Sequence, residues 1–203
     1  MSLFLITFWS IIGYLAGSLP WGYWISKYFY KIDIRTRGSG NIGATNVFRV
    51  LGPVPGIITF LLDVGKGSLP IILLKHLHQT NTNQAVLLIV GIATIVGSKF
   101  SIFLKGKGGK AVNCSFGVLL ALIPKEAFVS FLFWVLIFVA TGYVSLASII
   151  AAINLPVLLW LFQENREFVT GGIIISLIIV VAHKENIKRL LQRKENRFNL
   201  WKR

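Results

Sequence analysis

Apolar runs separated by short polar segments form the main pattern of this chain. Residues 3–24, 85–96 and 168–182 contain no charged side chain, and hydrophobic residues make up 55% of the 203 positions. A helix needs about 20 apolar residues to cross the hydrocarbon core of a bilayer, and several runs reach or approach that length. The pattern therefore predicts an all-α, polytopic integral membrane helix bundle.

Basic residues are concentrated in three blocks, and this distribution predicts how the helices cross the membrane. The other loops contain few basic residues: Lys75, Lys125 and Arg166. Because cytoplasmic loops carry an excess of Lys and Arg, seven spans that keep all three blocks inside place the N-terminus outside and the C-terminus in the cytoplasm. We expect one membrane-embedded domain, residues 1–203. Its basic blocks are residues 27–49, 99–110 and 184–203, and its spans are about residues 3–24, 53–74, 85–97, 111–123, 128–141, 146–162 and 168–182.

Two details of this topology stay open at the sequence level. The second span contains Asp63 and Lys66, so it is either one continuous helix or two re-entrant halves. The basic C-terminal segment predicts an interfacial amphipathic helix, with Ile187, Leu190 and Leu191 facing lipid or the bundle.

The net charge of +14, from 21 Lys and Arg against 7 Asp and Glu, restricts the partners. In a soluble protein this charge would suggest nucleic acid. Here no nucleic-acid motif accompanies it, and the positive-inside rule with attraction to anionic lipid explains the blocks. We therefore expect membrane lipid and no nucleic acid as partners. The single cysteine, Cys114, excludes an intrachain disulfide, and no His/Cys cluster has metal-ligand spacing, so we expect no metal and no cofactor.

The first polar motif follows the first basic run and combines three glycines with hydroxyl, amide and guanidinium groups. Glycines let backbone N–H groups turn toward an anion, and an arginine can fork onto its oxygens. The motif is thus typical of a phosphate-binding loop, although a flexible cytoplasmic loop is the alternative. Its candidate residues are Gly38, Ser39, Gly40, Asn41, Gly43, Thr45, Asn46 and Arg49.

The second motif lies within the second apolar run. Ionisable groups are costly in lipid, so Asp63 and Lys66 are expected either to serve a site or to pair with each other across one turn of helix. Both interpretations can hold at once, and Gly67 is included as a candidate substrate contact.

The third motif alternates lysines with glycines where the fourth predicted span begins. A helix N-terminus with glycine N–H groups and lysines favours an anion. A nucleotide-triphosphatase loop is excluded because Ala111 stands where that motif needs Ser or Thr after its lysine. A plain positive-inside cluster is the alternative. The candidates are Lys107, Gly108, Gly109 and Lys110.

The fourth group lies at the ends of later spans, on the face that the topology makes cytoplasmic. Ser145 follows the fifth span, and His183 and Asn186 follow the seventh. The last two are three residues apart and share a helix face. Alone, such residues would be satisfied polar groups at helix ends; with the other motifs they become candidates for a site.

Taken together and in this order, the motifs resemble those of the PlsY family, the bacterial acyl-phosphate:glycerol-3-phosphate acyltransferases. The resemblance covers essentially the whole chain. One departure is Ser98, where the family commonly has a histidine, and the residues after Lys110 also differ. The matching segments are GSGNIGATNV from Gly38 with Arg49, Asp63 with Lys66 and Gly67, KGGK from Lys107, and HKENI from His183 with Arg189 and Leu190.

The resemblance implies acyl transfer from a fatty acyl phosphate to glycerol 3-phosphate, giving 1-acylglycerol 3-phosphate (lysophosphatidic acid) and inorganic phosphate. This is the first step of bacterial phospholipid synthesis, and it implies a multi-pass protein of the bacterial inner (plasma) membrane with a cytoplasmic active site. Because no signature of covalent catalysis appears, we expect the glycerol hydroxyl to attack the acyl carbonyl directly. The expected catalytic residues are Ser39, Arg49, Lys107, Ser145, His183 and Asn186.

Two other functions fit parts of the pattern. A transporter of an organic phosphate would also direct helix ends at an anion, but it would show an inverted repeat and polar groups at the midplane. A structural lipid-binding protein is the weaker alternative. The base that removes the hydroxyl proton, a substrate phosphate or His183, also stays open, as does which residue holds which phosphate.

Overall fold

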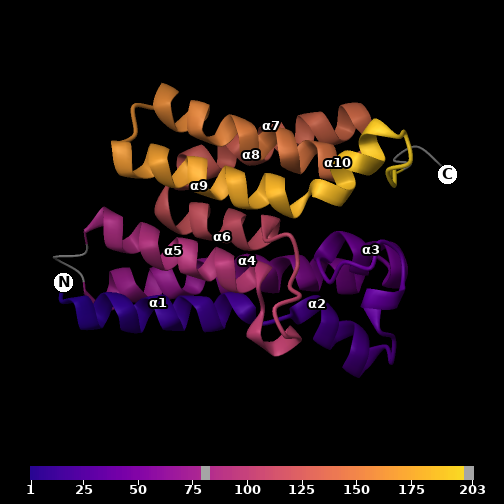
Figure 1. Ribbon diagram of the computed structural model, residues 1–203, viewed down its shortest axis with the longest axis horizontal. Coiled ribbons are helices and arrows are strands. Elements are labelled where there is room, and N and C mark those ends of the chain that lie inside the picture. The colour runs from indigo at the N-terminus through magenta and orange to yellow at the C-terminus, as the bar shows by residue number, and fades with distance from the viewer. Residues whose placement is uncertain (79–82, 199–203) are drawn as a thin grey trace. The chain divides into compact units, whose positions relative to one another are not determined.

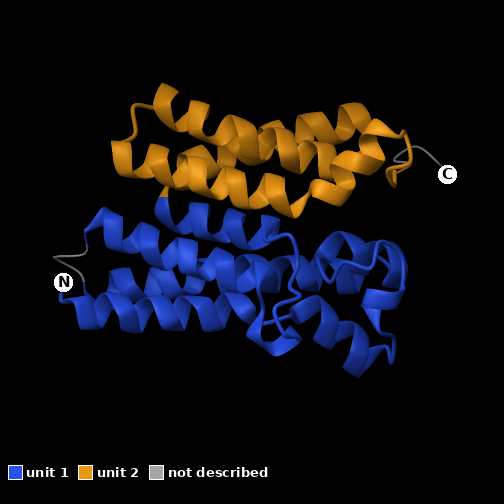
Figure 2. Ribbon diagram, in the orientation of Figure 1, with its two compact units in different colours: residues 1–122 blue, residues 123–203 orange. Residues whose placement is uncertain are grey.

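The computed structural model describes residues 1–78 and 83–198, and within them every regular element is helical (Figure 1). This confirms the all-α prediction. The chain divides into two compact units, Met1–Leu122 and Ile123–Arg203 (Figure 2). The single membrane domain expected for the whole chain stays a prediction.

The described residues of unit 1 form six α-helices and three short turns of other helix types. Helix α1 packs along α5, and α4 packs along both α3 and α6. The elements are α1 (Leu3–Ser18), α2 (Trp21–Trp24), the π turn η1 (Ile25–Phe29), the 3-10 turn η2 (Ile34–Thr36), α3 (Ala44–Leu51), α4 (Pro53–Leu77), α5 (Gln84–Lys99), the 3-10 turn η3 (Ile102–Leu104) and α6 (Val112–Leu122).

Glycines let these helices approach closely. A Cβ on Gly17 of α1 would lie 1.9 Å from the carbonyl oxygen of Thr94 in α5. A Cβ on Gly67 of α4 would lie 2.2 Å from the carbonyl oxygen of Cys114 in α6. Only a residue without a side chain permits such contacts between backbones. Gly67, a candidate substrate contact in the sequence, therefore has a packing role in this unit.

The first apolar stretch, predicted as one span over residues 3–24, is broken near its C-terminal end. Helix α1 ends at Ser18, and Leu19 takes an extended ψ of 116°. Pro20 explains the break, because proline disfavours helical geometry in the residue before it and has no N–H to donate. Helix α2 then continues into η1, so the apolar stretch reaches Phe29 rather than ending at Trp24.

The second predicted span is one continuous helix. Helix α4 extends without interruption from Pro53 to Leu77, which excludes two re-entrant halves. Proline is well suited to the first helical position, where its missing N–H is not needed. Asp63 and Lys66 therefore lie inside a helix and bond to each other.

Unit 2 contains α7 (Pro124–Thr141), α8 (Val144–Leu161), α9 (Arg166–Ala182) and α10 (Lys184–Leu191). Helix α8 packs against both α7 and α9, and α9 bends by 60° into α10. The amphipathic helix predicted for the C-terminal segment is wrong for residues 192–198, and residues 199–203 lie outside the described residues. Arg193 has a φ of 56°, a left-handed conformation that a right-handed helix cannot accommodate.

Five helical segments in the described residues are long and apolar enough to cross a membrane. The bent pair of α9 and α10 would make six, and α6, with 11 residues, is shorter than this criterion requires. The count of seven spans and the orientation of the termini stay predictions. The five segments are Leu3–Phe29, Pro53–Leu77, Gln84–Leu104, Pro124–Thr141 and Val144–Leu161.

Candidate functional site

The loop before α3 is shaped by the side chain of Asn46. Its Nδ2 group donates to the carbonyl oxygens of Ile34, Arg37 and Asn41, at 3.3, 3.0 and 2.8 Å. Its Oδ1 atom accepts from the backbone N–H of Ser39 at 2.8 Å. Asn46 is only 1% exposed, so these bonds form away from water. The amide thus organises the loop, rather than directly binding a phosphate as the sequence suggested.

Two glycines of this loop adopt conformations that other residues rarely take. Gly38 and Gly40 have φ values of 57° and 71°. A Cβ on Gly38 would also lie 2.3 Å from Oδ1 of Asn46. Asn41 closes the turn into α3, because its Oδ1 accepts from the N–H of Gly43 at 2.8 Å. Gly38 and Asn41 therefore maintain the loop's shape.

An ion pair lies directly before the loop. The guanidinium of Arg35 donates to both carboxylate oxygens of Asp33, from Nε at 2.9 Å and from Nη2 at 2.7 Å, and it stacks over the ring of Tyr23 at 4.5 Å. The hydrogen bond from Arg35 is the main reason that the pKa of Asp33 is lowered to about 2. Asp33 therefore stays ionised at any ordinary pH.

The third motif folds against this first loop. The carbonyls of Ser98 and Lys99, at the end of α5, accept from the N–H groups of Gly109 and Gly108, both at 3.1 Å. These two N–H groups cap α5 and are not directed at an anion, which corrects the simple phosphate cradle expected there. Gly108 has no room for a side chain, because a Cβ would lie 2.3 Å from the Ser98 carbonyl oxygen.

Several contacts join the two loops within unit 1. A Cβ on Gly109 would lie 3.7 Å from Oδ1 of Asn41. Leu104 packs in one buried cluster with Ile34, Ile42 and Val47. Turn η3 lies beside α2 (Figure 1), where the rings of Phe103 and Trp24 are 5.7 Å apart. The structure therefore brings the first and third motifs together, although they are about 60 residues apart in sequence.

The polar side chains on the joined loops differ in their exposure. Ser39 and Lys107 are exposed, whereas Thr45, Arg49 and Lys110 are half-buried. Hydroxyl, guanidinium and ammonium groups all donate hydrogen bonds to phosphate oxygens. The joined loops thus carry the donors that an anion needs, on a frame held by Asn46 and the buried cluster.

Asp63 and Lys66 form a buried pair inside α4. Nζ of Lys66 lies 2.7 Å from Oδ1 of Asp63, and it also donates to the Leu19 carbonyl oxygen at 2.8 Å. That carbonyl is at the break between α1 and α2. The pair therefore stabilises the broken span, and a role in substrate binding stays a prediction.

The polar residues of unit 2 converge on a carboxylate that the sequence analysis did not identify. Oε1 of Glu195 accepts from Oγ of Ser145 at 2.8 Å and from Nδ2 of Asn186 at 2.7 Å. Its Oε2 accepts from Nε of Arg189 at 2.7 Å. The Glu195 side chain is only 6% exposed. One signal could have revealed it: Glu195 is one of only two acidic residues in the basic C-terminal segment.

The carboxylate of Glu195 is charged at neutral pH. Burial by itself raises its pKa, but the hydrogen bonds from Asn186, Arg189 and Ser145 outweigh that effect and lower the pKa below its ordinary value. Ser145 and Asn186 therefore have their donor groups directed at an ionised partner.

His183 and Asn186 lie at the bend between α9 and α10. His183 is 2% exposed, and its Nδ1 donates to the Ile179 carbonyl oxygen at 2.8 Å. Asn186 is 4% exposed, and its Oδ1 has no hydrogen-bond partner within the described part of the chain. Because Nδ2 must donate to Glu195, the acceptor end of this amide is the end left for another group.

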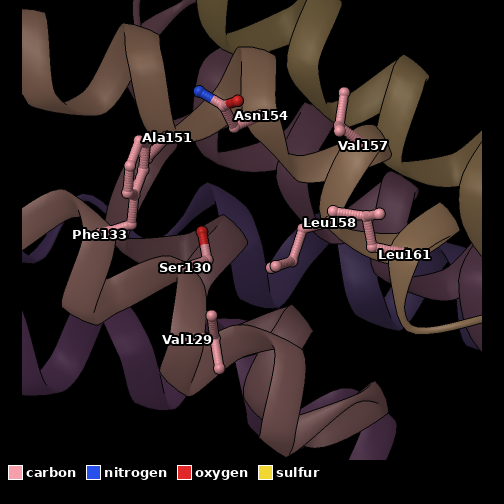
Figure 3. Close-up of a pocket in the computed structure, with 8 residues that line it drawn as sticks. All are labelled: Val129, Ser130, Phe133, Ala151, Asn154, Val157, Leu158 and Leu161. Atoms are coloured by element: carbon pink, nitrogen blue, oxygen red, sulfur yellow. The ribbon is translucent and has the colours of Figure 1, made fainter.

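Unit 2 also contains an apolar cavity between α7 and α8, of about 150 Å³ (Figure 3). None of the candidate site residues lines it. The cavity is lined by Val129, Ser130, Phe133, Ala151, Asn154, Val157, Leu158 and Leu161.

Across residues 1–78 and 83–198, no group of three or more His, Cys, Asp or Glu side chains could hold a metal ion.

Comparisons with known proteins agree with one another. A family model described as glycerol-3-phosphate acyltransferase matches residues 7–193. A protein of that description from Carboxydothermus hydrogenoformans is 39% identical over 188 residues, covering 93% of this chain and 94% of the relative. The crystal structure of PlsY (YgiH), an integral membrane glycerol 3-phosphate acyltransferase, is similar in its glycerol 3-phosphate form, with a TM-score of 0.89, 39% identity and 96% of each chain covered. Its lysophosphatidic acid form gives a TM-score of 0.86 at 37% identity, covering 96% of this chain and 95% of that one.

Proposed function

Because this chain belongs to the glycerol-3-phosphate acyltransferase family, we propose that it transfers a fatty acyl group from an acyl phosphate to glycerol 3-phosphate. The acyltransferase activity follows from the family, as does the multi-pass membrane fold. We also propose that the donor is an acyl phosphate, that the membrane is the bacterial inner membrane, and that the active site lies on its cytoplasmic side.

The reaction needs no covalent intermediate on the protein. The glycerol hydroxyl oxygen attacks the acyl carbonyl carbon, and the bond between that carbon and the phosphate oxygen breaks. The hydroxyl proton passes to a base, and the products are 1-acylglycerol 3-phosphate and inorganic phosphate. Both substrates carry a phosphate, so anion binding is the main requirement.

The observation that carries the proposal is the joining of the two glycine loops in unit 1. Ser39, Arg49 and Lys107 provide three kinds of phosphate donor on loops whose cores are buried together. Asn46 and the caps on α5 hold these loops in shape, so the donors are positioned before substrate arrives. Thr45 and Lys110, both half-buried, are further candidate phosphate contacts.

For unit 2 we propose that Asn186 orients the glycerol hydroxyl. Its Nδ2 is bound to Glu195, while its buried Oδ1 is an acceptor without a described partner. An acceptor suits a hydroxyl and not a phosphate dianion, which offers no hydrogen to donate. Ser145 and His183, on neighbouring elements of the same unit, would assist in orienting glycerol 3-phosphate.

A substrate phosphate is the base that we favour for the hydroxyl proton. The second pKa of a phosphate monoester is about 6, so the dianion is abundant at neutral pH. Nδ1 of His183 donates to a backbone carbonyl and thereby fixes the tautomer and orientation of the ring, so the pH dependence of the rate has to decide between the two bases.

The donor is tested with the purified protein in phospholipid vesicles. Acyl phosphate with glycerol 3-phosphate should release inorganic phosphate and form lysophosphatidic acid in equal amounts, and acyl-coenzyme A should give no comparable rate. Equal turnover with acyl-coenzyme A would overturn the donor and leave the acyltransferase activity intact.

The binding loops are tested by a matched pair of variants in the same assay. Lys107→Ala should lower kcat/KM by about tenfold or more, since it removes a charged donor to phosphate. Lys27→Ala removes the same charge from an exposed position in unit 1 and should retain activity. An equal loss of kcat/KM in both variants would show that Lys107 contributes only to the general surface charge and does not bind phosphate.

A further inference from the structure

The C-terminal residues Glu195 to Phe198 lie along the turn between α7 and α8, and we call them the strap. Beyond the bond from Ser145 to Glu195, Nε of Arg197 donates to the Thr141 carbonyl oxygen at 3.0 Å. The backbone N–H of Phe198 donates to the Gly142 carbonyl oxygen at 2.8 Å.

Ring contacts strengthen this arrangement. The guanidinium of Arg197 lies 5.9 Å from the ring centre of Tyr143, and the ring of Phe198 meets that of Phe138 edge-on at 5.9 Å. The contacts therefore extend from the last turn of α7 to the first turn of α8, all within unit 2.

The strap completes the C-terminus of α7. A helix leaves its last carbonyls without partners, and a residue in left-handed conformation commonly follows it. Gly142 has that conformation, with a φ of 74°. Arg197 and Phe198 supply donors to the carbonyls of Thr141 and Gly142, and the positive charge of Arg197 suits the negative end of the helix dipole.

The fit between strap and turn leaves no free space. A Cβ on Gly142 would lie 2.9 Å from both Cγ of Arg197 and the carbonyl oxygen of Phe198. The turn that the strap holds leads directly into Ser145, whose hydroxyl bonds to the strap's own Glu195. The strap therefore contacts Ser145 in two ways: it holds the turn that precedes Ser145, and its Glu195 accepts the hydrogen bond from the Ser145 hydroxyl.

We propose that Arg197 and Phe198 are positioning residues that hold Ser145 in place through the α7–α8 turn. This inference rests on the proposed role of Ser145 in orienting glycerol 3-phosphate. In this proposal the strap acts on glycerol 3-phosphate alone. Loss of its contacts should therefore change the KM for glycerol 3-phosphate and not the KM for acyl phosphate.

Kinetics with both substrates test the inference. Arg197→Ala should raise the KM for glycerol 3-phosphate about tenfold while the KM for acyl phosphate stays within about twofold. Arg197→Lys keeps the charge and a donor and should recover part of the loss. Lys194→Ala removes one charge from an exposed position in the same segment and should match the unaltered protein. Phe198→Ala should repeat the selective effect without any change in charge.

A double variant shows whether Arg197 acts through Ser145. In a Ser145→Ala background, Arg197→Ala should add little further to the KM for glycerol 3-phosphate, because residues in one network are not additive. Full additivity, an equal rise in both KM values, or normal kinetics for Arg197→Ala would each overturn the positioning role. A normal KM for Ser145→Ala itself would overturn the role proposed for Ser145, and with it this inference.

Discussion

The polar loops of unit 1 and the polar cluster of unit 2 are organised by different kinds of residue. In unit 1 a neutral amide, Asn46, holds the loop through four hydrogen bonds to backbone atoms. In unit 2 an ionised carboxylate, Glu195, holds three side chains. Both organisers are largely buried.

This difference determines what each region offers to a substrate. A neutral organiser that bonds only to backbone atoms does not itself engage the charged side chains of these loops, which suits binding of phosphate anions. A buried carboxylate consumes donors, including Arg189, and leaves unit 2 with an amide acceptor. We therefore assign anion binding to the first region and hydroxyl orientation to the second, and we expect only the second frame to depend on charge.

The largest expected effect comes from Asn46. Asn46→Ala removes all four bonds, each with a net contribution of about 0.5–1.5 kcal/mol, although the carbonyls of Ile34 and Arg37 keep a backbone donor. Activity should fall by about a hundredfold or more, with a lower melting temperature. Gln192→Ala changes an exposed amide outside the strap and the candidate site, and it serves as the control for both measurements. A variant of Asn46 with nearly full activity would show that the loop does not need this frame.

The second prediction concerns the donor geometry in unit 1. Arg49→Lys should retain less than about a tenth of the activity, a loss of more than about 1.4 kcal/mol of transition-state stabilisation, because lysine cannot reproduce the fork of a guanidinium. The kcat/KM for both substrates is the measurement. Arg37→Lys makes the same change at an exposed position of the same loop and should be tolerated. Near-normal kinetics for the Arg49 variant would make its charge alone sufficient.

The third prediction separates the two frames by charge. Glu195→Gln keeps the size but removes the charge that faces Arg189, and activity should fall about tenfold. The lowered pKa of Glu195 means that its ionised form stabilises the fold above the ordinary value of 4.5, and that this contribution is lost as pH falls through the lowered pKa.

Thermal melting between about pH 3 and 7 measures this contribution, since the range brackets the pKa of a free glutamate. The unaltered protein should lose stability on acidification more steeply than the Gln variant. Identical pH profiles for the two proteins would show that the charge of Glu195 does not stabilise unit 2.

The smallest expected effect is that of His183. His183→Asn should lower kcat/KM by about fivefold and keep an acidic limb near pH 6, because the substrate phosphate still titrates there. Rates across about pH 5 to 8 provide the test. If the limb disappears and the loss exceeds about a hundredfold, His183 is the base and the substrate-phosphate mechanism is wrong.

The sequence predicted most of what depends on local composition. Apolar runs and glycine or proline positions located most of the long helices to within a few residues. They did not reveal the break of the first span before Pro20, helix α3 inside the predicted phosphate loop, or the end of α10 at Leu191. They also missed the start of α7 at Pro124, which lies before the predicted residue 128. Proline suits a first helical turn, and the charged residues after it concealed this start. The resemblance of the motifs also identified the family, which the comparisons confirm.

The organisation of the polar residues could not be predicted in the same way. Asn46 was expected to bind phosphate, because a sequence shows which groups an amide carries and not which partners satisfy them. Glu195 was missed because its three partners come from the start of α8 and from α10, and Ser145 is 50 residues away. The sequence suggests that Gly108 and Gly109 bind an anion, but in the fold their N–H groups bond to the last carbonyls of α5.

The sequence by itself determined that this protein is helical, membrane-embedded and a member of its family, because hydropathy and motif order are properties of neighbouring residues. Only the tertiary structure decided which polar groups remain available for substrate. Hydrogen bonds in a buried setting form between residues that the fold brings together, whatever their separation in sequence, and each donor so used is lost to a ligand. Availability is therefore a property of the folded unit, as Asn46 in unit 1 and Glu195 in unit 2 both illustrate.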